Sequence, residues 1–365
     1  QLANLGLPTR TATPLQLSQQ GSTQRVLQPL AVAHRPQPLP LQLWPAQGPP
    51  RHAWVVLMPG LGGSGDQLSW LAGALAHWGW PVVVLEHPGS DANAMKASLQ
   101  GQRPPPGAES LAERLADVQA VLRAQQQGRL QALGVPAHTP VVLMGHSLGG
   151  LTALMATGLR PERGLAQRCR QALRRLPLTN LSRLLQCQLS SQAPKQPLQP
   201  AGAATPVAAV VSFNGFGSLL WPQGSLAALS TPVLMVGGSL DLITPPLQEQ
   251  LALFAGQHHP RSRLALIDGA SHFSPVRVNG HGEGSALFQL GDDLVGVDPR
   301  KVQALLLQLT TEFLQSLEQP LLLSPQIRVH DGVRAHVLNG RLARRWQQQI
   351  RTPGADPAGP PARRP

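Results

Sequence analysis

Short apolar runs, separated by longer stretches with helical periodicity, dominate the chain from residue 53 onward. Such runs, rich in valine and leucine and bounded by glycine, proline or polar residues, are typical of strands that helices bury on both faces. The runs cover Ala53 to Met58, Val82 to Leu85, Val141 to Met144, Val207 to Phe213, Val233 to Val236 and Leu264 to Ile267. The helix candidates are Gln67 to Trp78, Ser110 to Gln127, Gly150 to Leu159 and Lys301 to Leu317. This alternation predicts an α/β fold with a mainly parallel, doubly wound sheet.

The two ends of the chain lack this rhythm. Residues 1–24 are rich in Gln, Thr and Ser without a clear period, which predicts an N-terminal arm. Val26 to Val32 and Leu39 to Trp44 alternate apolar and polar positions and predict an edge hairpin, so the domain is expected to cover residues 25–318. Residues 319–365 are interpreted as a C-terminal extension with one patterned stretch, Ile327 to Ile350, and a disordered end.

One long insertion interrupts the alternation at about residues 160–205. An insertion at this point would lie over the carboxyl ends of the strands, where open α/β sheets bind ligands, and we interpret it as a lid. A second, glycine-rich insertion covers Phe273 to Pro299. Apolar residues in and after the lid indicate either an apolar substrate pocket or ordinary core packing. They are Leu178, Leu181, Leu184, Leu185, Phe213, Phe216, Leu219, Leu220 and Trp221.

The strongest chemical signal is a Gly-x-Ser-x-Gly turn that follows an apolar strand directly. Gly145, His146, Ser147, Leu148 and Gly149 form this turn, and a helical pattern continues after it. Such a turn presents a serine hydroxyl at the top of the sheet, and glycine is needed two positions before and after the serine because side chains there would collide. The pattern predicts a nucleophile elbow with Ser147 as the nucleophile. The alternative is a coincidental strand-to-helix glycine turn.

A serine nucleophile needs a histidine base and a carboxylate that orients it. Asp241 stands just past the apolar strand that ends in Gly237 and Gly238, and His272 follows the last apolar run, so both have the expected order along the chain. Asp241 has an alternative interpretation as a helix cap, and His272 as a structural histidine. Asp268 is the rival acid, and the rival bases are His87, His146, His258, His259 and His281.

Acyl transfer also needs N-H donors for an oxyanion. One candidate is the N-H of Leu148, at the start of the helix after the serine. The other is Leu61, in the glycine-rich loop Pro59 to Gly65 after the first buried strand. A phosphate cradle is the alternative for this loop, but no Gly-Lys-Ser or Gly-Lys-Thr follows it.

Together these blocks resemble the serine esterase and lipase branch of the α/β-hydrolase superfamily over roughly residues 39–318. The segments around Pro38 to Trp44, Glu86 to Ser90 and Ala112 to Val118 are similar to dienelactone-hydrolase-like and platelet-activating-factor-acetylhydrolase-like proteins. Two departures matter. Dienelactone hydrolases use cysteine where this chain has Ser147, and many relatives have histidine where it has Pro59.

The resemblance implies an α/β-hydrolase fold with an inserted lid and hydrolysis of carboxylic esters through an acyl-enzyme. Dehalogenases and epoxide hydrolases need a carboxylate at the position of Ser147, whereas cleavage of amides, thioesters and carbon-carbon bonds stays open. The ester is expected to be a small molecule, a lipid or a polymer, and a lipase or polyesterase acting on water-insoluble esters is an alternative. A noncatalytic binding protein on the same fold is the alternative of another class. No cofactor or metal is expected.

The formal net charge of +12 comes almost entirely from arginine, because lysine occurs only at Lys96, Lys195 and Lys301. No aromatic interleaving or nucleic-acid motif accompanies the arginines, so the alternatives are a solvated basic surface or a specific anionic partner, without nucleic acid. The two clusters are Arg163, Arg168, Arg170, Arg174, Arg175 and Arg183, and Arg341, Arg344, Arg345, Arg351, Arg363 and Arg364.

The cysteines are Cys169 and Cys187, both in the lid segment. Their spacing suits one local disulfide, with two free thiols as the alternative, and no further cysteine or close histidine completes a metal site. A disulfide favours a secreted or periplasmic protein, and a chain that begins at Gln1 looks processed. No apolar run reaches the length of a membrane span, and we expect a monomer.

Overall fold

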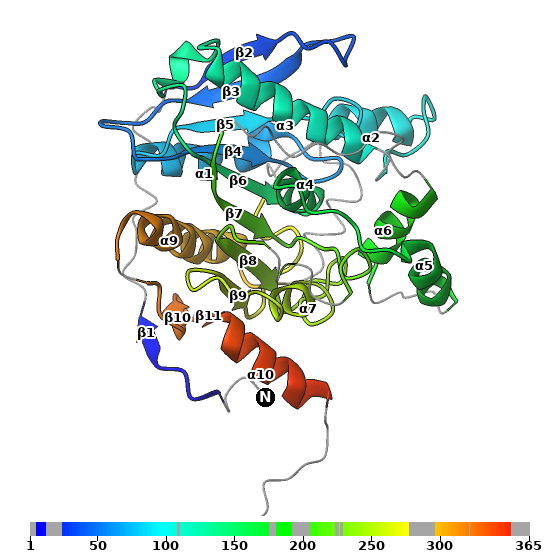
Figure 1. Cartoon of the computed structure of the whole chain (residues 1–365), viewed down its shortest axis with the longest axis vertical. Coiled ribbons are helices and arrows are strands. Elements are labelled where there is room, and N and C mark those ends of the chain that lie inside the picture. The colour runs from blue at the N-terminus through cyan, green and yellow to red at the C-terminus, as the bar shows by residue number, and fades with distance from the viewer. Residues whose placement is uncertain are drawn as a thin grey trace, which may run out of the picture.

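The computed structural model describes residues 5–11, 24–107, 110–174, 180–191, 205–222, 226, 229–276, 296–320 and 322–351. Within these residues, eleven strands form one sheet in the order β1-β10-β11-β9-β8-β7-β6-β4-β5-β3-β2 (Figure 1). The parallel middle consists of β5 (Val82–Leu85), β4 (Trp54–Met58), β6 (Val141–His146), β7 (Val207–Phe213), β8 (Val233–Gly238) and β9 (Arg263–Ile267). The predicted mainly parallel α/β sheet is therefore confirmed.

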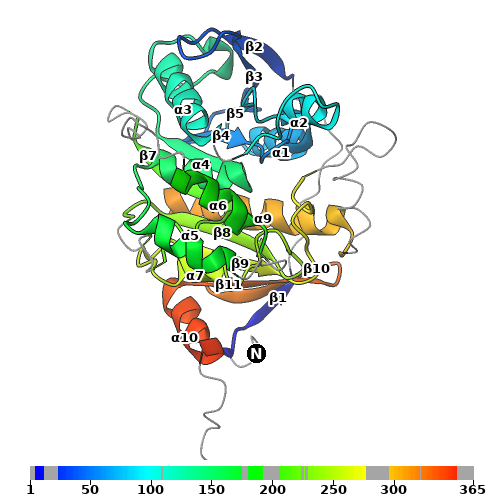
Figure 2. The ribbon, with the colours of Figure 1, turned by 90° about the vertical axis from the view of Figure 1, so that its right-hand side faces the viewer.

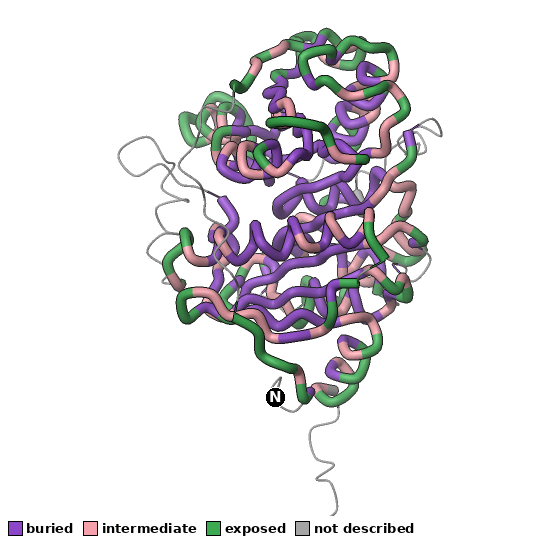
Figure 3. The backbone as a smooth tube through the Cα atoms, turned by 90° about the vertical axis from the view of Figure 1, so that its left-hand side faces the viewer, coloured by how far each residue is buried: buried purple, intermediate pink, exposed green. Residues whose placement is uncertain are grey.

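Helices cover both faces of the sheet, which explains why these strands are apolar throughout (Figures 1 and 2). On one face lie α1 (Ser69–His77) and α9 (Pro299–Glu318), and on the other α3 (Leu111–Gln126), α4 (Leu148–Ala156), α7 (Gln250–Phe254) and α10 (Gly340–Arg351). The shorter elements are η2 (Gly65–Leu68), α2 (Ala92–Leu99) and η4 (Gln131–Leu133). Figure 3 shows the buried strands between these layers. Among the described helices, none combines the length and apolar character of a membrane span.

Antiparallel strands extend both edges of the sheet, and one further strand, β1, adds to the last of them in parallel. The predicted edge hairpin is present as β2 (Val26–Leu30) and β3 (Leu39–Trp44), and β3 pairs with β5. At the other edge, β11 (Val333–Leu338) pairs with β9, β10 (Gln326–His330) with β11, and β1 (Thr9–Thr11) with β10. Parts of the expected arm and C-terminal extension thus join the same sheet as the predicted domain. The expected disordered end lies outside the described residues.

Candidate active site

The Gly-x-Ser-x-Gly segment forms a sharp turn between β6 and α4. Ser147 sits at the apex with φ 52° and ψ −116°, a strained conformation for a residue with a side chain. A Cβ on Gly145 would lie 2.3 Å from the carbonyl carbon of Gly149, and a Cβ on Gly149 would lie 2.4 Å from the carbonyl oxygen of Met58. The backbone therefore passes too close for side chains at either position, as the sequence predicts.

Ser147, His272 and Asp241 meet at the carboxyl ends of β6, β9 and β8. The His272 ring lies between the other two side chains, with Nε2 3.0 Å from Ser147 Oγ and Nδ1 2.9 Å from Asp241 Oδ2. All three residues are buried, with exposed fractions of 7%, 5% and 2% for Ser147, His272 and Asp241. The structure thus brings the three predicted residues together in one hydrogen-bonded line.

Four donors besides the histidine surround the Asp241 carboxylate. The backbone N-H groups of Ile243 and Thr244 donate to Oδ1 at 2.9 and 2.8 Å, while the Thr244 hydroxyl and Asn214 Nδ2 donate to Oδ2 at 2.6 and 2.7 Å. Burial raises the pKa of Asp241, but the His272 ring and the Thr244 bonds outweigh it and hold the pKa below its ordinary value. Asp241 is therefore ionised at neutral pH, and it caps its own turn while it contacts His272.

The rival residues lie elsewhere. Asp268 is 3.1 Å from His336 Nε2, with its side chain half exposed. His87 contacts Asp117, His258 contacts Arg344, and the His259 ring accepts from the Arg261 N-H. His281 lies outside the described residues.

His146 performs a positioning role that the sequence did not reveal. One of its ring nitrogens, Nε2, lies 2.7 Å from the backbone carbonyl oxygen of His272 and donates to it. Burial, reinforced by the neighbouring His272 ring, lowers the pKa of His146 to about 3, so the ring is neutral. His146 therefore links the Ser147 turn to the His272 loop through a hydrogen bond.

The predicted oxyanion donors border Ser147. Leu148 is the first residue of α4, so its N-H has no partner within the helix. The loop that carries Leu61 packs against the serine, since a Cβ on Gly60 would lie 3.1 Å from Ser147 Cβ. In the part of the chain that the structure describes, the N-H groups of Leu61 and Leu148 donate to no protein acceptor, whereas the next amide, Gly62 N-H, donates to the Ser90 carbonyl. Two free donors thus lie beside the hydroxyl.

The model of the Alpha/beta hydrolase family matches residues 55–279 of the chain. This span runs from the second residue of β4 past the end of β9 and includes all three residues of the hydrogen-bonded line. The chain belongs to the alpha/beta hydrolase family. No curated protein matches the chain. Membership establishes the fold and indicates a hydrolase in general, while the finer resemblance to dienelactone-hydrolase-like and acetylhydrolase-like proteins stays a prediction.

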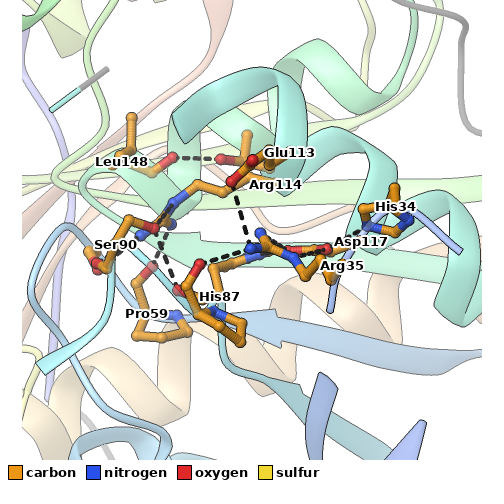
Figure 4. Close-up of polar contacts among 12 residues, drawn as sticks. His34, Arg35, Pro59, His87, Ser90, Glu113, Arg114, Asp117 and Leu148 are labelled. Atoms are coloured by element: carbon orange, nitrogen blue, oxygen red, sulfur yellow. Dashed lines mark hydrogen bonds and ion pairs between the residues drawn. The ribbon is translucent and has the colours of Figure 1, made fainter. Parts of the chain in front are cut away.

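In this α/β hydrolase, a buried arginine fixes the loop that carries Leu61. Arg114, on α3, is fully buried and donates from Nη1 to the Pro59 carbonyl at 3.0 Å and from Nη2 to the Gly60 carbonyl at 3.1 Å (Figure 4). Its Nε donates to Ser90 Oγ at 2.9 Å. In a trans peptide the C=O and N-H point in opposite directions. Holding the Gly60 oxygen therefore turns the Leu61 N-H away from Arg114.

A second polar cluster lies next to Arg114 and is centred on Asp117, which belongs to the same helix (Figure 4). Asp117 accepts from Arg35 through both carboxylate oxygens, each at 2.6 Å, and from His34 and His87 at 2.7 and 2.8 Å. His87 donates from Nδ1, while its buried Nε2 has no partner among the described residues. Burial, with Arg114 nearby, lowers the pKa of His87 to about 4. The ring is therefore neutral.

This buried histidine makes stability depend on pH. In the unfolded chain His87 becomes protonated below its ordinary pKa of 6.5, whereas in the folded chain it stays neutral down to about pH 4. The free energy of unfolding therefore decreases as the pH falls from 6.5 to about 4. Between pH 7 and 5 the loss from His87 alone is expected to be about 2 kcal/mol. Urea unfolding of the parent and of His87→Asn, which keeps a donor for Asp117, measures it. An equally steep pH dependence in both proteins would contradict the assignment.

The predicted lid contains α5 (Leu165–Leu173) and α6 (Ser182–Ser191). The buried Glu249 carboxylate connects α6 to the segment that follows β7. On the α6 side it accepts hydrogen bonds from Asn180, Ser182 and Gln186. On the other side it accepts from the N-H groups of Gly217 and Ser218. Four residues considered for an apolar pocket belong to the core instead: Phe213, Phe216, Leu220 and Trp221. Leu178 lies outside the described residues, and Leu185 packs against the core.

Cys169 of α5 and Cys187 of α6 form the predicted disulfide. Reduction is expected to increase the intact mass by about 2 Da and to lower the free energy of unfolding by about 3 kcal/mol. Mass spectrometry and urea unfolding, with and without reductant, provide the measurements. The Cys169→Ser/Cys187→Ser variant is the control, because reductant should leave its stability unchanged. An unchanged parent mass would mean that both thiols are free.

Proposed function

We propose that this α/β hydrolase cleaves carboxylic esters through an acyl-enzyme, with Ser147 as nucleophile, His272 as base and Asp241 as the orienting acid. The observation that carries the proposal is the continuous line from Ser147 Oγ through the His272 ring to Asp241 Oδ2. The ionised Asp241 accepts from Nδ1-H, which leaves the lone pair of Nε2 facing the hydroxyl. This is the tautomer that a general base needs.

In the first step, His272 Nε2 takes the Ser147 proton while Oγ forms a bond to the ester carbonyl carbon. The carbonyl oxygen becomes an oxyanion, and the N-H groups of Leu61 and Leu148 donate to it. The positive end of the α4 dipole adds to this stabilisation. The intermediate then collapses: the carbon-oxygen bond to the alcohol breaks, and His272 gives its proton to the departing oxygen.

The second step reverses the roles of the groups. Water gives a proton to His272 Nε2 and attacks the acyl carbon, the same N-H groups hold the oxyanion, and the bond to Ser147 Oγ breaks as the serine regains its proton. Asp241 stabilises the charged ring in both steps. His146 serves by holding the His272 backbone through its N-H, and its low pKa keeps the ring neutral near neutral pH.

Exposed leucines support a second candidate, a lipase or polyesterase acting on water-insoluble esters. Leu240 and Leu242 flank Asp241 in sequence and are 47% and 56% exposed, and Leu181 of the lid is 43% exposed. The lid lies beside the Asp241 loop, because the Ser182 N-H donates to the Ile243 carbonyl at 2.9 Å. Clustered exposed leucines are unusual unless they meet an apolar partner. Acyl chains of an insoluble ester are such a partner.

A panel of p-nitrophenyl esters with acyl chains of increasing length tests both candidates. The parent should hydrolyse the esters, and the Ser147→Ala variant should not. Higher rates on emulsified long-chain esters than on dissolved short ones would favour the lipase or polyesterase, and the reverse would favour a soluble ester. Equal rates for the parent and Ser147→Ala would mean a noncatalytic protein on this fold. The disulfide supports export to a secreted or periplasmic location.

A further inference from the structure

A pocket of about 530 Å³ lies at the amino-terminal end of β9, which is the end of the parallel strands opposite to Ser147. It is built where β9 begins and where β11 ends and leads into α10, whereas Ser147, Asp241 and His272 follow the carboxyl ends of their strands. The residues that line it are Gln257, His258, His259, Pro260, Arg263, Leu322, Ser324, Pro325, Asn339, Gly340, Arg341 and Arg344. The set contains three arginines and two histidines, and neither Asp nor Glu occurs among these lining residues.

Arg263 forms the buried wall of this pocket and is only 3% exposed. Its Nη1 donates to the carbonyls of Pro260 and Ser262 at 2.8 and 2.6 Å, and its Nε donates to the Leu323 carbonyl. The Nη2 group donates to no acceptor within the described ranges. Burial lowers the pKa of Arg263 only to about 10, so the guanidinium remains charged at neutral pH, and no carboxylate in the described part of the chain pairs with it. A buried cation of this kind needs a counter-charge.

The opening of the pocket adds more positive charge. Arg341 and Arg344 are exposed and extend from the first turns of α10. Arg344 Nη2 lies 3.2 Å from His258 Nδ1, and Arg344 Nε donates to the Ala255 carbonyl at 3.3 Å. No carboxylate of the described residues pairs with Arg344. Asn339 accepts from the Leu342 N-H and thereby caps the amino terminus of α10, whose dipole is positive at this end. Every fixed charge among the described residues that line the pocket thus favours an anion.

We propose that this pocket binds a small phosphate-type oxyanion, either free or as the monoester group of a small molecule. The planar guanidinium groups of Arg341 and Arg344 match the geometry of tetrahedral oxyanions and can each donate two parallel N-H bonds, while Arg263 offers the N-H groups of Nη2. Arg263 supplies a fixed donor at the base, while Arg341 and Arg344 close over the ligand from α10. The site is independent of the esterase proposal, since it neither contacts nor requires Ser147. It also assigns a role to the second arginine cluster of the sequence.

Inorganic phosphate, added at constant ionic strength with chloride as the reference salt, tests the site by thermal unfolding and calorimetry. Phosphate at about ten times its Kd should stabilise the folded chain measurably. The Arg341→Gln/Arg344→Gln variant should lose this response and bind phosphate at least about 10-fold more weakly, since two charge-assisted bonds disappear. Arg334→Gln/Arg345→Gln removes two exposed charges from β11 and α10 at described positions that do not line the pocket, and it should respond like the parent.

Methyl phosphate distinguishes the two sources of the ligand chemistry. Tighter binding of methyl phosphate than of inorganic phosphate would assign the site to a monoester, and the reverse would assign it to the free ion. Equal loss in both double variants would overturn the proposal, because it would show a general surface charge rather than a built site. So would a parent whose unfolding temperature in phosphate equals that in chloride. Neither outcome depends on esterase activity.

Discussion

Replacing Ser147 by alanine is expected to lower kcat/KM for p-nitrophenyl acetate by about four orders of magnitude or more. In the proposed mechanism Ser147 Oγ forms the covalent bond to the substrate, and no other hydroxyl lies within hydrogen-bond distance of His272 Nε2 among the described residues. Asp241→Asn should cost about as much, because an amide in place of the carboxylate removes the acceptor that fixes the Nδ1-H tautomer. Steady-state kinetics at matched protein concentrations measure both effects.

Asp268→Asn provides the matched control for the acid. Asp268 is four residues before His272 in sequence, but its side chain is half exposed and contacts His336. Its replacement should leave kcat/KM within about twofold of the parent, because surface substitutions of this kind change little. A large loss in Asp268→Asn together with a small loss in Asp241→Asn would exchange the roles of the two carboxylates.

Arg114→Met is expected to lower kcat by about 10-fold to 100-fold while KM changes little. Removing one oxyanion donor outright costs about 100-fold to 1000-fold, and loss of Arg114 should misplace the Leu61 N-H rather than delete it. The donor acts on charge that develops during the reaction, so its misplacement affects kcat. The rate of covalent labelling by a fluorophosphonate should fall in parallel. Arg114→Lys should restore little, since one ammonium cannot reproduce the contacts with Pro59, Gly60 and Ser90.

Arg35→Met separates this positioning role from simple destabilisation. Arg35 has a side chain that is 7% exposed and bonds Asp117 in the same region, but it does not contact the Pro59–Gly60 segment. Both variants should unfold at lower urea concentration than the parent, because each leaves buried polar groups without partners. Only Arg114→Met should lower kcat of the folded enzyme. Equal kcat losses in the two variants would mean that the arginines act through stability alone.

The sequence was most informative where a local pattern has a local cause. The valine-rich runs predicted the parallel strands because burial on both faces demands apolar side chains throughout. The elbow was equally readable, since Gly145 and Gly149 are required by backbone contacts only two residues from Ser147. The positions of Asp241 and His272 followed from chain order and strand ends, and the structure brings both to Ser147.

Contacts between segments far apart along the chain could not be predicted from the sequence. Arg114 lies on an ordinary amphipathic helix, and only the packing of α3 against the Pro59 loop shows what it holds. Asn214, which donates to Asp241, could have been noticed from the sequence because it directly follows the apolar run that forms β7. The structure adds that its φ is positive, at 50°. Strands β10 and β11 were missed because arginine and histidine interrupt their apolar positions. They complete the edge of the sheet where only one face needs apolar residues.

Covalent labelling with a fluorophosphonate, followed by peptide mapping, tests the central claim most directly. The reagent phosphonylates a hydroxyl only when a base removes its proton and nearby donors stabilise the anionic intermediate, so it reports the whole arrangement around Ser147. The account predicts one label per chain, located on Ser147, and none in the Ser147→Ala variant. A label on another residue, or equal labelling of the parent and Ser147→Ala, would contradict it.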